Sequence, residues 1–271
     1  MKAGERIRIG AVNYLNSRPL VYQLDQLAPQ AQILYDLPSR LADGLADGHY
    51  DVALVPSIEL LSHPGYVTVS DACIGCRGPV LSVKLFMRVP PRQIRSLAVD
   101  EGSRTSIALA LILLDRLCGV RPELCSLPIG AGLEETVDDA ILLIGDRAMH
   151  SPTGQFHQVW DLGDQWCRWT GLPFVFAMWT RRGDRSGGQL ETALAAARDA
   201  GVANLHEIAR AEAGPLGLTE PQCYNYLHDN LNFRLGSGER RGMELFFEHA
   251  SALGLAPGPA AVDQLAVRSN A

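Results

Sequence analysis

The chain has 271 residues, of which 47% are hydrophobic and 20% are charged, a balance typical of a folded globular protein with material for a large core. Twenty-four basic and thirty acidic residues give a formal net charge of −6. This charge argues against nucleic-acid binding, which needs a basic surface to displace counterions. An anionic ligand must therefore be held by a local cluster of donors rather than by the overall field.

The sequence also argues against a membrane protein and against export. Its longest apolar stretches, such as Ile107–Leu114, are far shorter than the ~20 residues that a membrane-spanning helix needs. Met1–Ile9 is charged and lacks the apolar core of a signal peptide. We therefore expect a cytoplasmic protein that does not bind membranes, with its six cysteines reduced. The single CxxC pair, Cys73 and Cys76, has no second pair to complete a zinc site.

The first part of the chain alternates strand and helix patterns. Residues 6–12 predict a strand, and a helix begins near Arg18-Pro19, because proline suits the first helical turn. A second helix is predicted over 39–48 and a buried strand over 51–55. This order, with short connections, predicts an α/β sheet with parallel strands.

The middle of the chain predicts a second α/β unit, and the end predicts a return to the first. The expected elements are strands at 82–89, 96–100, 140–144 and 174–180, and helices at 107–118, 191–200, 204–213 and 242–253. Pro90-Pro91 ends the regular structure of the 82–89 strand. We therefore predict two lobes, one made of residues 1–89 with 174–271 and the other of residues 90–173, joined by crossovers near 87–92 and 172–176.

The strongest candidate for a binding site is the segment 100–106, which follows a predicted strand, where open α/β sheets bind ligands. Free backbone N–H groups at the start of the next helix, together with nearby side chains, would hold a carboxylate or a phosphate; these side chains are Ser103, Arg104, Thr105 and Ser106. Helix capping alone would explain Ser103. It would not explain a basic residue and two more hydroxyls at the positive end of a helix dipole.

Motifs for bound cofactors are missing from the sequence. It contains no GxxxxGK[ST] or GxGxxG nucleotide motif and no GxSxG nucleophile elbow, and its seven histidines lack metal-ligand spacing. Asp146 ends an apolar strand and could accept a substrate hydroxyl or a proton. A salt bridge from Asp146 to Arg147 or to another arginine is the alternative.

Six segments of the chain, taken together, resemble the chorismate dehydratase family of the futalosine route to menaquinone. They occur in the expected order between about residue 7 and residue 255, and they are Gly10–Leu20, Ala53–Glu59, Gly78–Val83, Val99–Ser106, Leu143–Ala148 and Trp169–Val175. The resemblance implies a two-lobed α/β fold of the type II periplasmic-binding-protein kind, with two crossovers between the lobes. It further implies a hydro-lyase that converts chorismate to 3-[(1-carboxyvinyl)oxy]benzoate and water, without a metal or an organic cofactor.

The resemblance also implies roles for residues. Those expected to bind the substrate carboxylates and face the ligand are Ser17, Arg18, Ser57, Ser82, Ser103, Arg104, Thr105 and Ser106. Asn13 takes the family's key asparagine position as a catalytic residue. Since an amide cannot take a proton at neutral pH, our hypothesis is that Asn13 positions chorismate, whose own enolpyruvyl carboxylate removes the C3 proton. Asp146 is the rival base.

Two other functions remain open at this point. One is a 1,4-dihydroxy-6-naphthoate synthase-like lyase of the same pathway, for which a histidine base is expected where Gly145-Asp146-Arg147 stands. The other is a solute-binding protein for a small carboxylate, which would need export or a lipid anchor. The sequence makes no prediction about oligomeric state.

Overall fold

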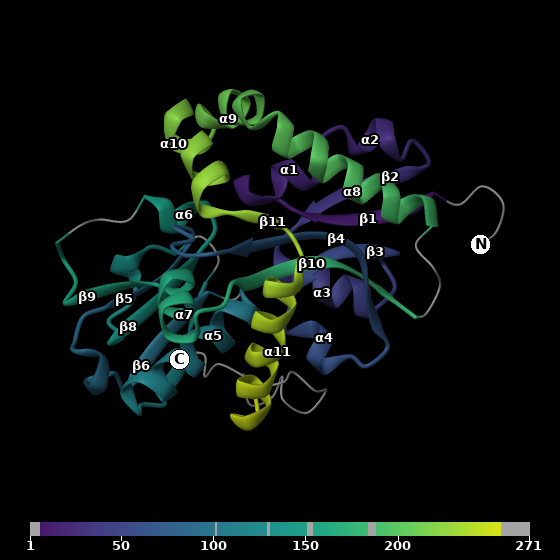
Figure 1. The fold of residues 1–271 in the computed structure, drawn as a ribbon. Helices are drawn as coiled ribbons and strands as arrows, with labels where there is room; N and C mark the ends of the chain where they lie inside the picture. The colour runs from purple at the N-terminus through teal and green to yellow at the C-terminus, as the bar shows by residue number, and fades with distance from the viewer. Residues whose placement is uncertain (1–5, 101, 129–130, 151–153, 184–187, 256–271) are drawn as a thin grey trace.

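The computed structural model describes residues 6–100, 102–128, 131–150, 154–183 and 188–255. Two β-sheets lie side by side, each with helices packed against it (Figure 1). The first sheet has the order β11-β4-β10-β3-β1-β2, with β1 at Ile7–Val12, β2 at Ala31–Asp36, β3 at Val52–Pro56, β4 at Tyr66–Cys76, β10 at Phe174–Arg182 and β11 at Asn232–Arg234. The second sheet has the order β7-β6-β8-β5-β9, with β5 at Val83–Met87, β6 at Ser96–Asp100, β7 at Glu123–Leu127, β8 at Ala140–Ile144 and β9 at Gln158–Asp161.

The two sheets share one plan. In the first, β1 is parallel to β2 and β3, and β10 enters antiparallel to β3. In the second, β6 is parallel to β7 and β8, and β5 enters antiparallel to β8. Each antiparallel strand is the one that follows a passage of the chain from the other sheet. Each lobe is therefore a parallel α/β unit completed by a strand arriving across the junction.

The passage into the second sheet comes earlier than the sequence predicted. The chain leaves the first sheet at the end of β4 and joins the second at β5, so the first crossover is 77–82 rather than 87–92. The lobe boundary predicted at residue 89 is wrong for the same reason, because β5 pairs with β8 and β9. The return crossover, 171–173, lies between the end of α7 (Leu162–Thr170) and β10.

Apolar composition explains the central strands. Every residue of β3 and of β8 is buried, as expected for strands covered by helices on both faces of a sheet. The carboxyl ends of both strands point to the junction of the lobes, where Pro56 and Gly145 follow the apolar runs. The buried strands β3 and β8 thereby place the loops that follow them at the junction of the two lobes.

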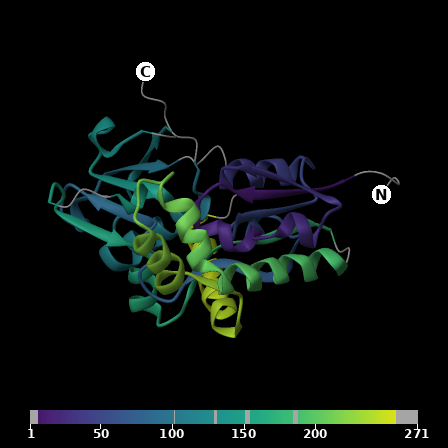
Figure 2. The same cartoon turned by 90° about the horizontal axis from the view of Figure 1, so that it is seen from above.

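Helices cover both faces of the first sheet. They are α1 (Arg18–Val21), α2 (Leu24–Leu27), α3 (Pro38–Ala46), α4 (Glu59–Ser62), α8 (Gly188–Ala203), α9 (Leu205–Ala213) and α10 (Glu220–Asn225). Long α8 runs along α1, α2 and β4 on one side, and α3 packs on β1 and β3 on the other (Figures 1 and 2). Gly201 permits the contact of α8 with α1, because a Cβ there would lie 2.1 Å from the Pro19 carbonyl oxygen.

In the second lobe, the buried helix is α5 (Arg104–Cys118), which packs against α7 and β8, while α6 (Asp146–Met149) follows β8 directly. The C-terminal helix α11 (Ser237–Ala252) lies on β10 and also contacts α5 (Figure 1). The last helix thus spans both lobes beside the return crossover.

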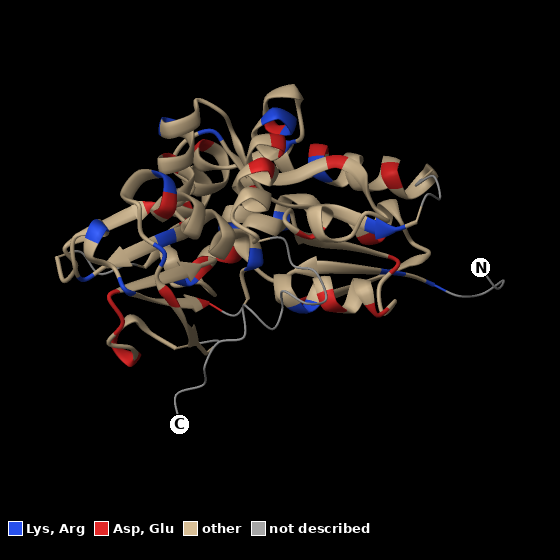
Figure 3. Ribbon diagram, turned by 90° about the horizontal axis from the view of Figure 1, so that it is seen from below, with Lys and Arg blue, Asp and Glu red and all other residues tan. Residues whose placement is uncertain are grey.

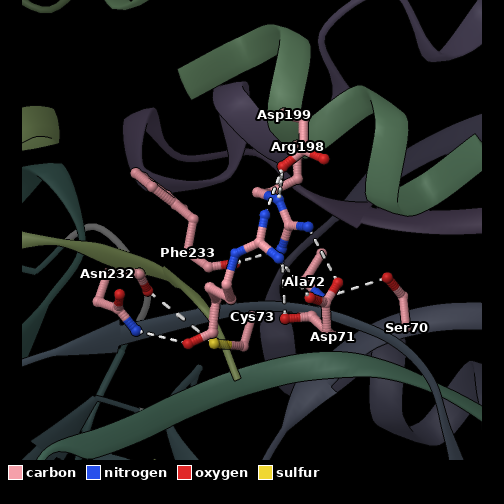
Figure 4. Close-up of polar contacts among 9 residues, drawn as sticks. Ser70, Asp71, Ala72, Cys73, Arg198, Asp199, Asn232 and Phe233 are labelled. Carbon is pink, nitrogen blue, oxygen red and sulfur yellow. Dashed lines mark hydrogen bonds and ion pairs between the residues drawn. The ribbon is translucent and has the colours of Figure 1, made fainter. Parts of the chain in front are cut away.

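A buried arginine fixes the edge of the first sheet. Arg198 of α8 is 3% exposed and donates to the Asp71 carboxylate at 3.0 Å, to the Phe233 carbonyl at 3.2 Å and to Asp199 at 2.6 Å (Figure 4). Asp71 is on β4 and Phe233 on β11, so one guanidinium joins a helix to the edge strand β11 and to its neighbour β4.

Charge is spread over the surface. Basic and acidic residues are interspersed along the ribbon of both lobes (Figure 3). None of the described helices is both long enough and apolar enough to cross a membrane.

Candidate functional site between the lobes

A cavity lies at the junction of the two lobes, and junctions between lobes or domains are a common place for small-molecule sites. Both lobes and the first crossover contribute to its lining, which consists of Val12, Tyr14, Asn16, Pro38, Pro56, Ile74, Val80, Ser82, Val83, Ser103, Thr105, Ser106, Ile144, Gly145, Phe176 and Ala177. Most of these residues are apolar, a few carry hydroxyl or amide groups, and none of those described is charged. A ligand here is held by apolar contact and by neutral hydrogen-bonding groups.

The start of α5 forms one wall. Ser103, Thr105 and Ser106 are all buried and line the cavity. The Ser103 side chain does not cap the helix, and the first N–H groups of any α-helix have no intrahelical acceptor. This wall therefore presents hydroxyls and helix-terminal amides to the cavity.

Arg104 faces away from the cavity. Its Nη1 donates to Glu59 Oε1 at 3.0 Å and its Nη2 to Asp43 Oδ1 at 2.5 Å. Both acids belong to the first lobe, so Arg104 forms a salt bridge across the junction. The structure thus gives Arg104 a role in joining the lobes rather than the predicted contact with substrate.

Thr105 makes a second link between the lobes. Its Oγ1 accepts the Ile58 N–H at 3.2 Å and lies 3.5 Å from Ser57 Oγ. Ser57 donates instead to the Val175 carbonyl at 2.7 Å, and it does not line the cavity. We expected Ser57 to bind substrate, but its hydroxyl joins the end of β3 to β10.

Tyr14 extends from the first lobe onto the second. A Cβ on Gly145 would lie 3.0 Å from the Tyr14 ring, and the φ of Gly145 is +68°. Burial, reinforced by the charge of Asp100, raises the pKa of Tyr14 to about 12. Tyr14 is therefore a neutral aromatic wall that only a glycine opposite can accommodate.

The predicted asparagine and the asparagine at the cavity are different residues. Asn13 is exposed, accepts from Arg18 Nη2 at 3.3 Å and does not line the cavity. Asn16, three residues later, lines it, and its Oδ1 is buried without a hydrogen-bond partner. The repeated Asn-x-x-Asn in this loop left two candidates, and only the turn at 15–17 shows which one points inward.

Ser17 and Arg18, both predicted to bind substrate, serve the loop instead. Ser17 Oγ donates to the Val12 and Tyr14 carbonyls, which fixes the turn after β1. Arg18 Nε lies 3.0 Å from Glu212 Oε1, and its guanidinium lies over the Tyr35 ring. Neither residue lines the cavity.

Ser82 lines the cavity from the first crossover. It is 1% exposed, and its Oγ has no hydrogen-bond partner. The preceding Leu81 has φ +60°, an unfavourable value for a branched side chain. Asp161 holds this backbone by accepting the N–H groups of Val80 at 2.9 Å and Leu81 at 2.7 Å. Backbone strain that a partly buried carboxylate holds in place is typical of a functional position.

Asp146 begins α6 beside the cavity but does not line it. Both of its oxygens accept the Leu15 N–H, at 3.2 and 3.4 Å, so the carboxylate holds the loop that carries Asn16. Burial raises the pKa of Asp146, opposed by this hydrogen bond and by Arg18. The alternative of a salt bridge from Asp146 to Arg147 is not found, because Arg147 pairs with Asp100. Among the described residues no group of three or more His, Cys, Asp or Glu is placed to bind a metal ion.

Sequence comparison places this geometry in a family. A family model described as "Menaquinone biosynthesis" matches residues 7–252. The chain belongs to this family. A Thermus thermophilus protein named chorismate dehydratase is 32% identical over 265 residues, covering 91% of this chain and 95% of the relative. The resemblance of the six sequence segments is thereby confirmed.

Comparison of structures confirms the predicted fold class. Protein AF1704 from Archaeoglobus fulgidus has a TM-score of 0.74 at 18% identity, covering 93% of this chain and 99% of the other. The periplasmic aliphatic sulphonate binding protein SsuA of Escherichia coli has a TM-score of 0.62 at 15% identity, covering 94% and 89%. The alkanesulfonate-binding protein SsuA of Xanthomonas axonopodis pv. citri, bound to MOPS, has a TM-score of 0.56 at 16% identity, covering 93% and 94%. At these identities the similarity establishes the two-lobed periplasmic-binding-protein fold.

Proposed function

We propose that this member of the menaquinone-biosynthesis family is a chorismate dehydratase, a hydro-lyase. The observation that carries the proposal is the 32% identity, over nearly the whole chain, with the T. thermophilus protein of that name. The cavity supports it, because a small cyclic dicarboxylate needs apolar walls for its ring and donors for its anionic groups. Both are present at the junction of the lobes.

In the proposed complex, the ring carboxylate lies at the start of α5. The hydroxyls of Ser103, Thr105 and Ser106 and the first amides of the helix donate to it, and the helix dipole favours its charge. Residues of the apolar wall, such as Ile74 and Phe176, contact the ring. Asn16 and Ser82 face the ring hydroxyl from the first lobe and the crossover.

The reaction needs no external electron carrier. The C3–H electron pair forms the new ring double bond as the C4–O bond breaks, and the proton goes to the substrate's own enolpyruvyl carboxylate. That proton then joins the departing hydroxide, so the products are an aromatic ether and water. The cavity's contribution is to orient the C3–H bond and the carboxylate and to exclude bulk water.

Turnover of chorismate tests the proposal. We expect the purified protein to abolish the diene absorbance of chorismate and to form 3-[(1-carboxyvinyl)oxy]benzoate, identified by mass spectrometry. Saturable binding of chorismate without its consumption would instead indicate a solute-binding protein. If the protein consumes only a precursor of 1,4-dihydroxy-6-naphthoate, it is the 1,4-dihydroxy-6-naphthoate synthase-like lyase.

An Asp146→Asn variant tests the rival base. Because Asp146 holds the Leu15 N–H and does not line the cavity, we expect kcat to fall by less than about 10-fold. A fall of ~10²-fold or more would make Asp146 the base. The amide keeps an oxygen acceptor for Leu15, so the variant keeps the loop in place.

A further inference from the structure

Tyr226 lies behind the cavity, next to its two unpartnered polar residues. It begins the π-helix Tyr226–Asn230, which follows α10 and precedes β11 at the junction of the lobes (Figure 1). The side chain is 1% exposed. Its hydroxyl lies near the polar groups of Ser82 and Asn16, whose proximity opposes the strong rise in the pKa of Tyr226 that burial causes. The phenol therefore stays protonated at any physiological pH and acts only as a neutral donor and acceptor.

Three oxygens at this point are buried without a satisfied hydrogen bond: Asn16 Oδ1, Ser82 Oγ and the Tyr226 hydroxyl. Buried polar groups in folded proteins are almost always paired, so a cluster of three that are not needs an explanation. Two of the three residues line the cavity. A ligand oxygen in the cavity would supply the missing partner.

The backbone around these three oxygens has unusual geometry that holds them close together. π-Helices are rare and occur frequently at functional sites. The end of this one is tied to the first crossover by Asn230, whose Nδ2 donates to the Pro79 carbonyl at 2.9 Å. The same crossover carries the strained Leu81 and the cavity residue Ser82. The π-helix and the Ser82 turn are thus held together.

We propose that Tyr226 is a positioning residue that completes a closed ring of hydrogen bonds with Asn16, Ser82 and the leaving hydroxyl of the substrate. In this ring the substrate hydroxyl donates to Asn16 Oδ1, and Asn16 Nδ2 donates to the Tyr226 oxygen. Tyr226 then donates to Ser82 Oγ, and Ser82 donates to the substrate oxygen. Each group gives one hydrogen and accepts one, and the Ser82 donor points at the oxygen on which negative charge develops.

This inference rests on the proposed dehydration and names the group that orients its donor. The test is Tyr226→Phe in the full chain, with chorismate as the substrate. Loss of a transition-state donor costs roughly 10²–10³-fold in kcat when the donor itself is removed. For a residue acting through Ser82 we expect a fall of at least ~10-fold, with KM within about threefold. The melting temperature should stay the same or rise, because an unpartnered buried hydroxyl is removed.

Tyr224→Phe is the matched control. Tyr224 is two residues away, on α10, and stacks on His206 with ring centroids 3.9 Å apart, outside the cavity lining. We expect it to keep kcat within about twofold. A Tyr226→Phe enzyme with kcat equally unchanged would overturn the inference while leaving the dehydration intact.

A double-mutant cycle separates positioning from a general structural effect. If Tyr226 acts through Ser82, the Tyr226→Phe/Ser82→Ala enzyme should have the same kcat as Ser82→Ala alone. If the fall in kcat of the double variant instead equals the product of the falls in the two single variants, the two residues act independently, and the inference is wrong. A wild-type protein that leaves chorismate unchanged would remove the proposed function and this inference with it.

Discussion

Asn16 and Ser17 are neighbours in one short turn, and their side chains have different surroundings. Ser17 Oγ is buried and bonded to two backbone carbonyls, so its hydrogen-bonding capacity is used by the fold. Asn16 Oδ1 is also buried, and it has no partner. A buried acceptor left open is destabilising by about 1–3 kcal/mol. An unpaired acceptor at the edge of a cavity is explained if a bound ligand donates a hydrogen bond to it.

This difference gives a prediction for the two asparagines of the loop. Asn16→Ala should lower kcat by roughly 10²-fold, because it removes an amide aimed at the reacting end of the substrate. Asn13→Ala is the matched change three residues away, on an exposed side chain, and should keep kcat within about twofold. Steady-state kinetics with chorismate measures both. The reverse ranking would restore Asn13 as the functional asparagine and show that the loop rearranges when substrate binds.

At the scale of elements, the outer strands β4 and β11 depend on a helix for their position. Arg198 of α8 bonds to Asp71 and to the Phe233 carbonyl, and β11 directly follows the π-helix that carries Tyr226. A guanidinium buried to this degree is tolerated only when its donors are satisfied. The position of Tyr226 behind the cavity is therefore coupled to the Arg198–Asp71 ion pair.

Arg198→Met should lower the free energy of unfolding by roughly 3 kcal/mol, because it leaves Asp71 with fewer partners and the Phe233 carbonyl of β11 without its donor from α8. Arg210→Met on α9 is the control. That side chain is 76% exposed, with Nε 3.7 Å from Glu220, and its loss should change stability by less than about 1 kcal/mol. Urea unfolding with unchanged m-values measures both variants. Equal losses would mean that the buried network contributes no more than a surface pair.

The sequence predicted the elements with strong apolar signals. Strands β6 and β8 occur at the predicted bounds, and α5, α8 and α9 were predicted within three residues. Helix α11 begins five residues earlier than predicted, and α10 was not predicted. β4 was missed, because its Gly-Cys-rich end resembles a loop and its pairing with β10 is long-range. The same cause displaced the first crossover, since only sheet pairing shows that β5 belongs to the second lobe.

The candidate site was predicted in the same uneven way. Hydroxyls at the start of α5 face the cavity because a helix after a parallel strand must start there. Arg104 could not be excluded from the sequence, since its acids, Glu59 and Asp43, are 45 and 61 positions away. Tyr226 was missed for a similar reason. No local pattern indicates that a residue of the C-terminal third faces Ser82.

The whole molecule is in an arrangement in which the lobes touch around the cavity. Arg104 pairs with Glu59 and Asp43 across the junction, Thr105 accepts the Ile58 N–H, and Asp146 accepts the Leu15 N–H. Each contact joins the first lobe to the second next to the cavity lining. Two-lobed binding proteins close by hinge motion around their ligand. Here two of the residues that make these contacts, Arg104 and Asp146, lie outside the cavity lining, whereas Thr105 both lines the cavity and joins the lobes.

Gly145 limits how closely the lobes can approach, and this gives the last prediction. Its φ of 68° and ψ of −156° belong to a region that is essentially restricted to glycine, and its Cβ position lies 3.0 Å from the Tyr14 ring of the other lobe. Gly145→Ala should therefore both strain the backbone and hold the lobes apart, lowering kcat/KM by at least ~10-fold, which corresponds to about 1.4 kcal/mol of closure. The radius of gyration with product bound, from small-angle scattering, should be larger than that of the wild type.

Gly119→Ala is the control, because Gly119 has φ 71° at the end of α5 with no atom within 4 Å of its Cβ position. It should lose about 1 kcal/mol of stability from the backbone and keep its kcat/KM. Closure to the wild-type radius by Gly145→Ala would show that the Tyr14–Gly145 contact does not control the distance between the lobes.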